Sequence, residues 1–448
     1  MESFRERHVF VVGAGRSGFV SALRLYGEGA HVTLLDERPK EAVEETLRQP
    51  IPPQVAFLHG RMSGKAAQGA DLVVLSPGVP RDKLPLEALR RAGAPVWGEL
   101  ELGYRLFRGK VAAVTGTNGK STVTTLLGEM AARAFPRVFV GGNLGVPFVA
   151  AAGEEMDWAV VEASSFQLES IESFRPKVAV LLNLTEDHRD RYPDFASYAG
   201  AKMEIFRNQG SGDIAVLNGD DPEVSARAAQ VRAEKLLVSL SRPLDRGAFV
   251  SGEEILFRDG TVEERYPRSL LRIRGLQNLE NALAAVAAAR SMGVPPDAVR
   301  ESLEAFPGLP HRVEFVRKVR EVSYVNDSKG TNVGAVLKCL EGFAEPVVLI
   351  AGGKDKGVDF RPLREPLARK ARAVILIGEA RARMEREIAG AVPVHGAASM
   401  EEAVREAAAR ARAGDVVILS PACSSFDMFR DFEERGEAFR EAVRGLPE

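Results

Sequence analysis

A glycine-rich loop carries the clearest chemistry in the chain. Residues 115–122 read TGTNGKST and lie between an apolar run and a predicted helix over residues 121–133. Glycines let backbone N–H groups close around phosphate oxygens, Lys120 adds a positive charge, and Ser121 offers a hydroxyl to Mg²⁺. The two glycines are only two residues apart, closer than in the common phosphate loop. Because strand, loop and helix still follow in the expected order, we predict a site for ATP or a close relative.

A second glycine-rich turn follows the first apolar run. Residues 13–18 read GAGRSG, and Asp36 ends the next predicted strand, which is the layout of a dinucleotide fingerprint. The same geometry suits any nucleoside diphosphate, because the glycines let phosphates approach a helix N-terminus while the carboxylate accepts hydrogen bonds from a nucleoside. Residues 76–80 form a further loop that we expect at the same sheet edge. Taken alone, this turn favours an NAD-dependent dehydrogenase, and a tight turn without any ligand is the other alternative.

Two residues near the ends of predicted strands could ligate a metal. Glu162 ends one strand, and His188 lies in a polar run, residues 183–190, after the next. If the sheet is parallel, both lie at the edge that carries Lys120 and Ser121. One carboxylate, one imidazole and phosphate oxygens could then hold Mg²⁺, which needs few protein contacts. Surface hydrogen bonding is the alternative for each residue by itself.

Three polar loops follow predicted strands toward the C-terminal end. Residues 324–332, 352–356 and 420–425 are rich in lysine and hydroxyl side chains. At one sheet edge they would suit a small anionic substrate, because charged donors bind carboxylates strongly. Arg312 lies just past a proline–glycine stretch, residues 307–310, which we expect to act as a hinge.

Strand-like runs alternate with amphipathic helical runs along the chain, which is typical of α/β folds with mainly parallel sheets. A length of 448 residues favours about three domains. We predict a Rossmann-like N-terminal domain over residues 1–98, a central domain like the phosphate-loop ATPases over 99–308, and a Rossmann-like C-terminal domain over 309–448. Asn278 begins a predicted alanine-rich helix over residues 278–292, where its amide could contact a base or phosphate, or simply cap the helix.

The predicted strands cover residues 8–12, 31–35, 54–58 and 71–75 in the first domain. In the second they cover residues 157–162, 178–182 and 213–217, with short β segments between residues 236 and 273 and a helix over 195–207. In the third they cover residues 347–351, 373–377 and 415–419.

Composition excludes several classes of protein. The formal net charge is -2 and the pI is about 6.4, so no basic field favours nucleic acid. Cys339 and Cys423 are the only cysteines, which argues against a disulfide framework or a zinc site. The first residues are charged, and no apolar run approaches the ~20 residues of a membrane span. We therefore predict a cytoplasmic protein without nucleic-acid partner or membrane insertion.

Asparagine is scarce and unevenly distributed. Nine asparagines occur, and seven of them lie in the motifs above: Asn118, Asn143, Asn183, Asn278, Asn281, Asn326 and Asn332. A chain that avoids this amide elsewhere and keeps it in these motifs indicates that the motifs need its chemistry.

Together, these motifs resemble the Mur ligase family, the ATP-dependent amino-acid ligases of peptidoglycan synthesis, over essentially the whole chain. The resemblance is carried by residues 115–122, the region of Glu162, residues 185–188 and residues 309–312. Within the family, the chain resembles the branch that adds D-glutamate to UDP-N-acetylmuramoyl-L-alanine. The residues that carry this closer resemblance are GGNLG at 141–145, NDSK at 326–329 and SPAC at 420–423. Another amino-acid adder of the same family and a non-catalytic nucleotide-binding module are the alternatives.

The resemblance implies a mechanism and a set of catalytic groups. ATP would phosphorylate the L-alanyl carboxylate, and the amine of D-glutamate would attack the resulting acyl phosphate. The catalytic residues would be Lys120, His188 and Lys202. Two Mg²⁺ ions would be held by Ser121, Glu162, His188 and a carbamylated Lys202. By itself, Lys202 would be interpreted as a solvated helix lysine, and the protein is expected to be a monomer.

The resemblance also implies which residues contact each substrate. ATP would contact Gly116, Thr117, Asn118, Gly119, Lys120, Ser121, Thr122, Asn278, Arg312 and Asp327. The uridine nucleotide would contact Arg16, Ser17, Asp36, Arg38, Ser76 and Gly78, with Asn143 nearer the muramoyl end. D-Glutamate would contact Lys329, Thr331, Lys356, Ser425 and the backbone of Phe432.

Two positions depart from the family pattern. Gln277 stands where histidine is usual, which leaves the role of that side chain open. Gly330 stands where alanine is common, and we expect this change to be mild.

Overall fold

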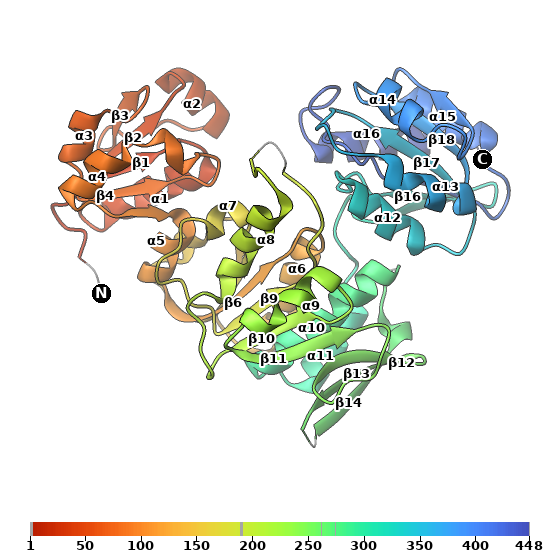
Figure 1. The fold of residues 1–448 in the computed structure, drawn as a ribbon, viewed down its shortest axis with the longest axis horizontal. Helices are drawn as coiled ribbons and strands as arrows, with labels where there is room; N and C mark the ends of the chain where they lie inside the picture. The colour runs from red at the N-terminus through yellow and green to blue at the C-terminus, as the bar shows by residue number, and fades with distance from the viewer. Residues whose placement is uncertain (1–2, 189–190, 261, 274, 448) are drawn as a thin grey trace.

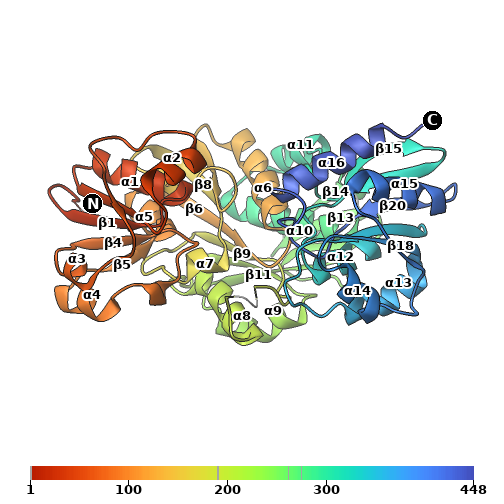
Figure 2. The same ribbon diagram turned by 90° about the horizontal axis from the view of Figure 1, so that it is seen from above.

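The computed structural model describes residues 3–188, 191–260, 262–273 and 275–447. The chain forms three units, each built on its own sheet, and the N-terminal and C-terminal units lie at opposite ends with the central unit between them (Figures 1 and 2). The prediction of a three-part α/β protein with mainly parallel sheets is confirmed. The proposed boundaries at residues 98/99 and 308/309 stay a prediction.

The N-terminal sheet is parallel throughout and has the order β3-β2-β1-β4-β5. Its strands are β1 His8–Val12, β2 His31–Asp36, β3 Ala56–His59, β4 Leu72–Leu75 and β5 Val96–Gly98. Its helices are α1 Arg16–Gly27, α2 Lys40–Leu47, α3 Gly64–Gln68, α4 Leu86–Ala92 and the short 3-10 helix η1 Arg81–Lys83. The chain reverses direction across the sheet between β1 and β4, the place where open α/β sheets bind ligands.

The central sheet has the order β14-β13-β12-β11-β10-β9-β6-β8-β7. Its strands are β6 Arg108–Thr115, β7 Val138–Gly142, β8 Glu155–Glu162, β9 Val178–Leu181, β10 Ile214–Asn218, β11 Glu234–Ser239, β12 Gly247–Ser251, β13 Glu254–Asp259 and β14 Val262–Pro267. Its helices are α5 Glu99–Leu106, α6 Lys120–Ala134, α7 Ser165–Leu168, α8 Phe195–Met203, α9 Pro222–Arg227, α10 Leu276–Met292 and α11 Pro296–Ala305. Its 3-10 helices are η2 Phe148–Ala151, η3 Glu204–Phe206, η4 Ala228–Gln230 and η5 Arg268–Leu270.

The C-terminal sheet has the order β15-β16-β20-β17-β18-β19. Its strands are β15 Glu314–Val319, β16 Val322–Asn326, β17 Val347–Gly352, β18 Ala371–Ile377, β19 Val394–Gly396 and β20 Val416–Leu419. Its helices are α12 Val333–Glu341, α13 Arg364–Lys370, α14 Arg381–Glu387, α15 Met400–Arg410, α16 Phe432–Arg444 and the 3-10 helix η6 Arg361–Leu363. Because β16, β20 and β17 are adjacent and parallel, the three polar loops that follow them leave the sheet at one edge, as predicted.

Several elements differ from the sequence-based expectation. Strands β5, β7, β15 and β19 were not predicted, and β12 to β14 and the β15–β16 pair are antiparallel. Helix α10 begins at Leu276 with Gly275 as its N-cap, so Asn278 lies inside the first turn and the capping alternative is wrong. The predicted helix over residues 195–207 divides into α8 and η3, because the chain tightens to a 3-10 turn at Glu204.

The alanine-rich helix α10 packs against α6, the helix that follows the phosphate loop. Ala284 and Ala285 of α10 are buried in the same core as Leu126 and Met130 of α6. Short alanine side chains let the two helices approach closely, which fixes the axis of α6 relative to the sheet.

No helix among the described residues is long and apolar enough to cross a membrane. Both cysteines are buried free thiols.

Replacing Ala285 by leucine is expected to destabilise the central unit by about 1–3 kcal/mol, because Ala285 is fully buried in a core with no room for extra methylenes. Ala409, which is exposed on α15, provides the matched control, and Ala409→Leu is expected to change stability by less than about 0.5 kcal/mol. Urea unfolding followed by fluorescence measures both variants. Similar shifts for the two would contradict the close packing described here.

Candidate active site

Two glycines and one asparagine determine the conformation of the phosphate loop. Gly116 and Gly119 have φ angles of 149° and 89°, which L side chains rarely adopt. The backbone N–H of Asn118 donates to Asn183 Oδ1 at 2.7 Å, and Asn183 Nδ2 donates back to the Asn118 carbonyl at 3.0 Å. The N–H of Thr117 donates to the Asn183 carbonyl at 2.9 Å. Asn183 therefore fixes the backbone of the loop. The N–H groups in the first turn of α6 lack partners within the helix, so they are available to bind an anion such as a phosphate group.

Two lysine side chains converge on one carbonyl of this loop. Lys120 Nζ and Lys202 Nζ each lie 2.9 Å from the Gly116 carbonyl oxygen. Lys202 is buried, with 2% of its surface exposed, and burial followed by repulsion from Lys120 holds its pKa well below the ordinary value. Burial also lowers the pKa of Lys120, while the nearby Glu162 carboxylate acts in the opposite direction. Lys202 is therefore no solvated helix lysine, and the site concentrates positive charge at the phosphate loop.

Glu162 lies at the end of β8, next to β6 in parallel register, so it reaches the edge that carries the phosphate loop. Asn143 Nδ2 donates to Glu162 Oε1 at 2.7 Å. The other oxygen, Oε2, is buried and has no hydrogen-bond partner among the described residues. A buried carboxylate oxygen without a partner is costly, and a divalent cation would satisfy it. The oxygen chemistry of this position therefore fits Mg²⁺.

His188 follows β9 and is placed by aromatic neighbours. Its ring centroid lies 4.8 Å from that of Phe166 and 6.1 Å from that of Tyr198. Lys202 Nζ lies 4.7 Å from the Tyr198 ring centroid, so Tyr198 contacts two of the predicted metal ligands. No group of three or more His, Cys, Asp or Glu residues that could hold a metal occurs in the described part of the chain. The ligand set of Glu162, His188 and Lys202 stays a prediction, and residues 189 and 190 of the same polar run lie outside the described residues.

A cavity of about 690 Å³ opens between the central and C-terminal units. The predicted D-glutamate residues Thr331, Lys356, Ser425 and Phe432 line it, and so does His188. The carboxylates of Asp355, Asp431 and Glu433 also line it and were not predicted. The structure therefore brings residues from three separate loops to one cavity beside the phosphate loop.

Lys329 links this cavity to the phosphate loop. Its Nζ donates to Ser121 Oγ at 3.1 Å and lies 5.0 Å from the Phe432 ring centroid. Burial, followed by repulsion from Arg312, lowers the pKa of Lys329 to about 8. The predicted amino-acid residue and the predicted metal and ATP residue are thus in direct contact.

A second cavity, of about 390 Å³, lies at the hinge. Asn278 and Arg312, predicted for adenine and ribose, line it together with Pro307 and Gly308. Asp327 accepts a hydrogen bond from Ser420 Oγ at 2.8 Å, and burial raises its pKa to about 6. Burial lowers the pKa of Arg312, partly offset by Asp327 and Glu162. Pro307 and Gly308, from the predicted hinge, therefore form part of the wall of this cavity.

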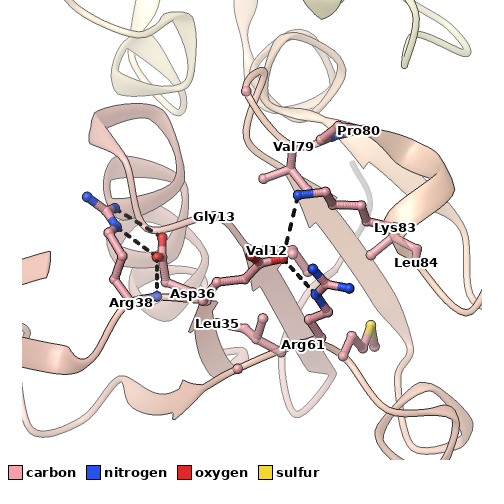
Figure 3. Close-up of a pocket in the computed structure, with 14 residues that line it drawn as sticks. Val12, Gly13, Leu35, Asp36, Arg38, Arg61, Val79, Pro80, Lys83 and Leu84 are labelled. Carbon is pink, nitrogen blue, oxygen red and sulfur yellow. Dashed lines mark hydrogen bonds and ion pairs between the residues drawn. The ribbon is translucent and has the colours of Figure 1, made fainter.

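A third cavity, of about 270 Å³, lies over the carboxyl ends of β1, β2 and β4 (Figure 3). Asp36, Arg38 and Gly78 line it, as predicted for a nucleotide site. Both oxygens of Asp36 are already engaged, since Ala14 N donates to Oδ2 at 2.7 Å and Arg38 Nε donates to Oδ1 at 2.9 Å. These bonds lower the pKa of Asp36 against the effect of burial.

The other residues predicted to contact the uridine nucleotide do not line this cavity. Arg16 is exposed on α1, and the Ser17 carbonyl accepts a hydrogen bond from Ser21 at 2.8 Å. Ser76 Oγ donates to the Gly13 carbonyl at 2.6 Å, so it fixes the glycine turn. Asn143 lies on Glu162, in the central unit.

The rim of this cavity carries an ion-paired set that sequence analysis missed. Arg61 Nε lies 2.9 Å and Lys83 Nζ 3.6 Å from Glu37 Oε1, and all three residues line the cavity. The charge of each residue is visible in the sequence, but their meeting depends on how the loops after β2, β3 and β4 fold. The contacts of Asn183 with Asn118 and of Asp187 with Asn332 were not predicted, for the same reason.

The fold and these sites define a nucleotide-binding α/β protein with a phosphate loop at the junction of its central and C-terminal units. Residues 7–98 match the family model described as Mur ligase MurD-like, N-terminal domain. Residues 114–289 match Mur ligase middle domain, and residues 311–423 match Mur ligase, glutamate ligase domain. The chain belongs to the Mur ligase family.

Relatives align with nearly the whole chain. A UDP-N-acetylmuramoylalanine--D-glutamate ligase of Geobacter metallireducens is 46% identical over 442 residues, covering 98% of each chain. The protein of the same name from Pelotomaculum thermopropionicum is 45% identical over 453 residues, covering 100% of this chain and 99% of its own. Among solved structures, the MurF ligase of Thermotoga maritima in complex with ADP has a TM-score of 0.63 at 18% identity, covering 98% of this chain and 96% of its own. The structure of a pseudomurein peptide ligase type C of Methanothermus fervidus has a TM-score of 0.63 at 20% sequence identity, covering 99% of this chain and 100% of its own. These structures share the fold.

The close packing around Gly330 argues against the expectation that this departure is mild, which stays a prediction. A Cβ atom at Gly330 would lie 2.5 Å from Asp327 Oδ2 and 2.7 Å from Ser420 Oγ. Both distances are too short for van der Waals contact, so a methyl group would push apart the Asp327–Ser420 hydrogen bond. The second departure, Gln277, is half-buried in the first turn of α10, beside Asn278.

Replacing Gly330 by alanine is therefore expected to destabilise the C-terminal unit by about 1–3 kcal/mol through overpacking. Gly27→Ala is the control, because nothing lies within 4 Å of a Cβ built at that exposed position. Thermal melting of both variants measures the difference. A melting temperature for Gly330→Ala equal to that of Gly27→Ala would contradict the close contact.

Proposed function

We propose that the chain is an ATP-dependent ligase that joins D-glutamate to UDP-N-acetylmuramoyl-L-alanine in the synthesis of peptidoglycan precursors. Relatives that align with nearly the whole chain carry the name UDP-N-acetylmuramoylalanine--D-glutamate ligase. The observation that carries the proposal is the contact of Lys329 with Ser121, because it brings a loop suited to a dicarboxylate against a loop suited to ATP. An amide formed from a phosphorylated carboxylate needs this juxtaposition.

The reaction would proceed in two transfers. The γ-phosphoryl group of ATP would pass to the L-alanyl carboxylate, giving an acyl phosphate and ADP. The amine of D-glutamate would attack the acyl carbon, the C–O bond to phosphate would break, and the proton lost by the amine would leave with inorganic phosphate. Phosphoryl transfer depends on alignment and charge neutralisation. Lys120 and Arg312 would supply both, since each carries a positive charge at the phosphate loop or the hinge cavity.

The amino-acid site would hold its substrate by charge. Lys329 and Lys356 would bind the two carboxylates of D-glutamate, with Thr331, Ser425 and the backbone of Phe432 as hydrogen-bonding partners. His188 lines the same cavity, so it would lie near the reacting carbonyl.

Ser121 would hold one Mg²⁺ together with the phosphate oxygens. Glu162, His188 and a carbamylated Lys202 would hold a second. The metal would supply charge neutralisation for the phosphates and polarise the reacting carbonyl. The lowered pKa of Lys202 favours the neutral amine, which is the form that combines with CO₂ to give a carbamate and a proton. The unpartnered Oε2 of Glu162 supports a cation at this position.

The uridine nucleotide would occupy the cavity of the N-terminal unit, against Arg16, Ser17, Asp36, Arg38, Ser76 and Gly78, with Asn143 toward the muramoyl group. Adenosine would occupy the hinge cavity, near Asn278, Arg312 and Asp327. We propose further that the three domains are residues 1–98, 99–308 and 309–448, and that the protein acts as a cytoplasmic monomer without membrane insertion.

Phosphate release is the direct test of this function. Purified protein with Mg-ATP and UDP-N-acetylmuramoyl-L-alanine is expected to release phosphate with D-glutamate and not with L-glutamate, L-lysine or meso-diaminopimelate. Lys120→Ala is expected to lower kcat by at least about 100-fold, because the developing phosphate charge loses its cation. Lys235→Ala, at an exposed position on β11, is the control and should retain activity. Turnover with another amino acid would be consistent with a Mur ligase but would contradict D-glutamate as the substrate.

Inhibition by glutarate tests the role of Lys329. Glutarate has both carboxylates of glutamate and no amine, so its own charge is constant above neutral pH. Because the pKa of Lys329 is about 8, its ammonium form is complete at lower pH and is lost as pH rises through 8. The inhibition constant against D-glutamate is therefore expected to rise about tenfold between pH 7 and 9.

In Lys329→Arg the guanidinium stays charged over this range, so the pH dependence is expected to disappear even where the absolute affinity falls. A parent protein whose glutarate inhibition does not change between pH 7 and 9 would contradict the assignment.

A further inference from the structure

Three asparagines form a continuous chain of amide contacts across the junction of the central and C-terminal units. Asn183 clamps the backbone of Asn118 through two hydrogen bonds, at 2.7 and 3.0 Å. The side chain of Asn118 then faces the other unit, where Asn332 Nδ2 donates to its Oδ1 at 3.3 Å. With only nine asparagines in the chain, three of them in one line of contacts is a concentrated use of this residue.

The orientation of the Asn332 amide is determined by its neighbours. Its Oδ1 accepts a hydrogen bond from the backbone N–H of Ala335 at 2.8 Å and so caps α12. A backbone N–H can only donate, so the oxygen must face the helix and the NH₂ group must face outward. The NH₂ group meets two acceptors, Asn118 Oδ1 at 3.3 Å and Asp187 Oδ2 at 3.2 Å. Aspartate or serine at this position could cap the helix, but neither could also donate to both acceptors.

Asp187 extends these contacts to the cavity between the units. Its Oδ1 accepts a hydrogen bond from the backbone N–H of His188 at 2.9 Å and lies 4.0 Å from Lys356 Nζ. Asn332 is buried, with 6% of its surface exposed, and directly follows Thr331, which lines that cavity. One amide therefore joins the phosphate loop, the His188 segment and the loop that carries Lys329.

The other contact between these loops, Lys329 to Ser121, uses groups that the proposed function gives to substrates and metal. Asn118 is also a predicted ATP contact, but its side chain bonds to Asn332, so this contact can persist where ATP meets the backbone of the loop. Figure 2 shows α12 beside α10, whose partner helix α6 carries the phosphate loop at its start. A change in the position of the phosphate loop would therefore move the loop that carries Asn332, because these amide hydrogen bonds connect the two.

We propose that Asn332 is a positioning residue that couples occupation of the phosphate loop to the ordering of the amino-acid loop, residues 327–332. The bound nucleotide holds the loop at Asn118, Asn118 holds Asn332, and Asn332 fixes Lys329 and Thr331 relative to the reacting phosphate. The kinetic consequence rests on the proposed function, whereas the coupling itself requires only that a nucleotide binds at the phosphate loop.

Hydrogen–deuterium exchange of the full chain tests the coupling without any amino acid. In the parent protein, Mg-AMP-PNP is expected to slow exchange both in residues 116–124 and in residues 329–336. In Asn332→Ser the hydroxyl still caps α12, but the two outward hydrogen bonds are lost. Slowing is therefore expected to remain in 116–124 and to disappear in 329–336.

Ser399→Ala is the matched control, because it removes the N-cap of α15 in the same unit, where Ser399 Oγ accepts from Glu402 N at 3.2 Å. This control is expected to keep the nucleotide effect in both segments. Equal slowing of 329–336 in Asn332→Ser and the parent would overturn the proposal, as would a parent in which the nucleotide has no effect there. Loss of the effect in Ser399→Ala as well would also overturn it, since general destabilisation of the unit would then be the cause.

Steady-state kinetics provide the second arm. Asn332→Ser is expected to raise KM for D-glutamate about tenfold, which corresponds to the loss of one to two hydrogen bonds. KM for the UDP-linked substrate is expected to be unchanged. An unchanged KM for D-glutamate would overturn the positioning role. A parent protein that turns over no D-glutamate would instead contradict the proposed function, and the exchange experiment would still decide the coupling.

Discussion

Buried and partly buried positive charge around the phosphate loop is the constraint on which the rest of the site depends. Lys120 and Lys202 share the Gly116 carbonyl, and Lys329 and Arg312 approach from the C-terminal unit. Burial lowers the pKa of all four side chains, and repulsion from a neighbouring cation lowers the pKa of Lys120, Lys202 and Lys329 further. The protein offsets this repulsion only in part, so the site favours a ligand with several negative charges. A nucleoside triphosphate with a dicarboxylate has that charge.

The parallel sheets explain how these charges come together. Strand β6 lies between β8 and β9, so Glu162 and the segment of His188 leave the central sheet at the edge of the phosphate loop. The C-terminal sheet presents its loops in the same way from β16, β20 and β17. Two cavities, of about 390 and 690 Å³, are lined by residues of both the central and the C-terminal unit. An anion that binds to loops of both units would stabilise the arrangement in which these loops meet.

Sequence patterns predicted most of the fold and the outline of the site. Long apolar strands and glycine loops are local signals, so β1, β6 and the turn before α6 lie where they were predicted. Edge strands such as β7 and β19 were missed because their residues are only partly buried and their alternation is weak. The start of α10 was misplaced because Gly275, not the asparagine, has the conformation of the cap.

Contacts between distant segments were beyond local patterns. The pairing of Glu37 with Arg61 and Lys83, and of Asn332 with Asn118, depends on tertiary structure. The space left at Gly330 likewise depends on Ser420, 90 positions away in the chain. The resemblance to a family supplied the residue roles, and those roles still require experiment.

Thermal melting of the unmodified protein at constant ionic strength tests the central claim most directly. If the cations form a polyanion site, Mg-ADP must raise the melting temperature, and the rise must continue with concentration as ligand linkage requires. Sodium chloride added to the same ionic strength must not reproduce the effect. A melting temperature that is the same with saturating Mg-ADP as with salt alone would contradict the account.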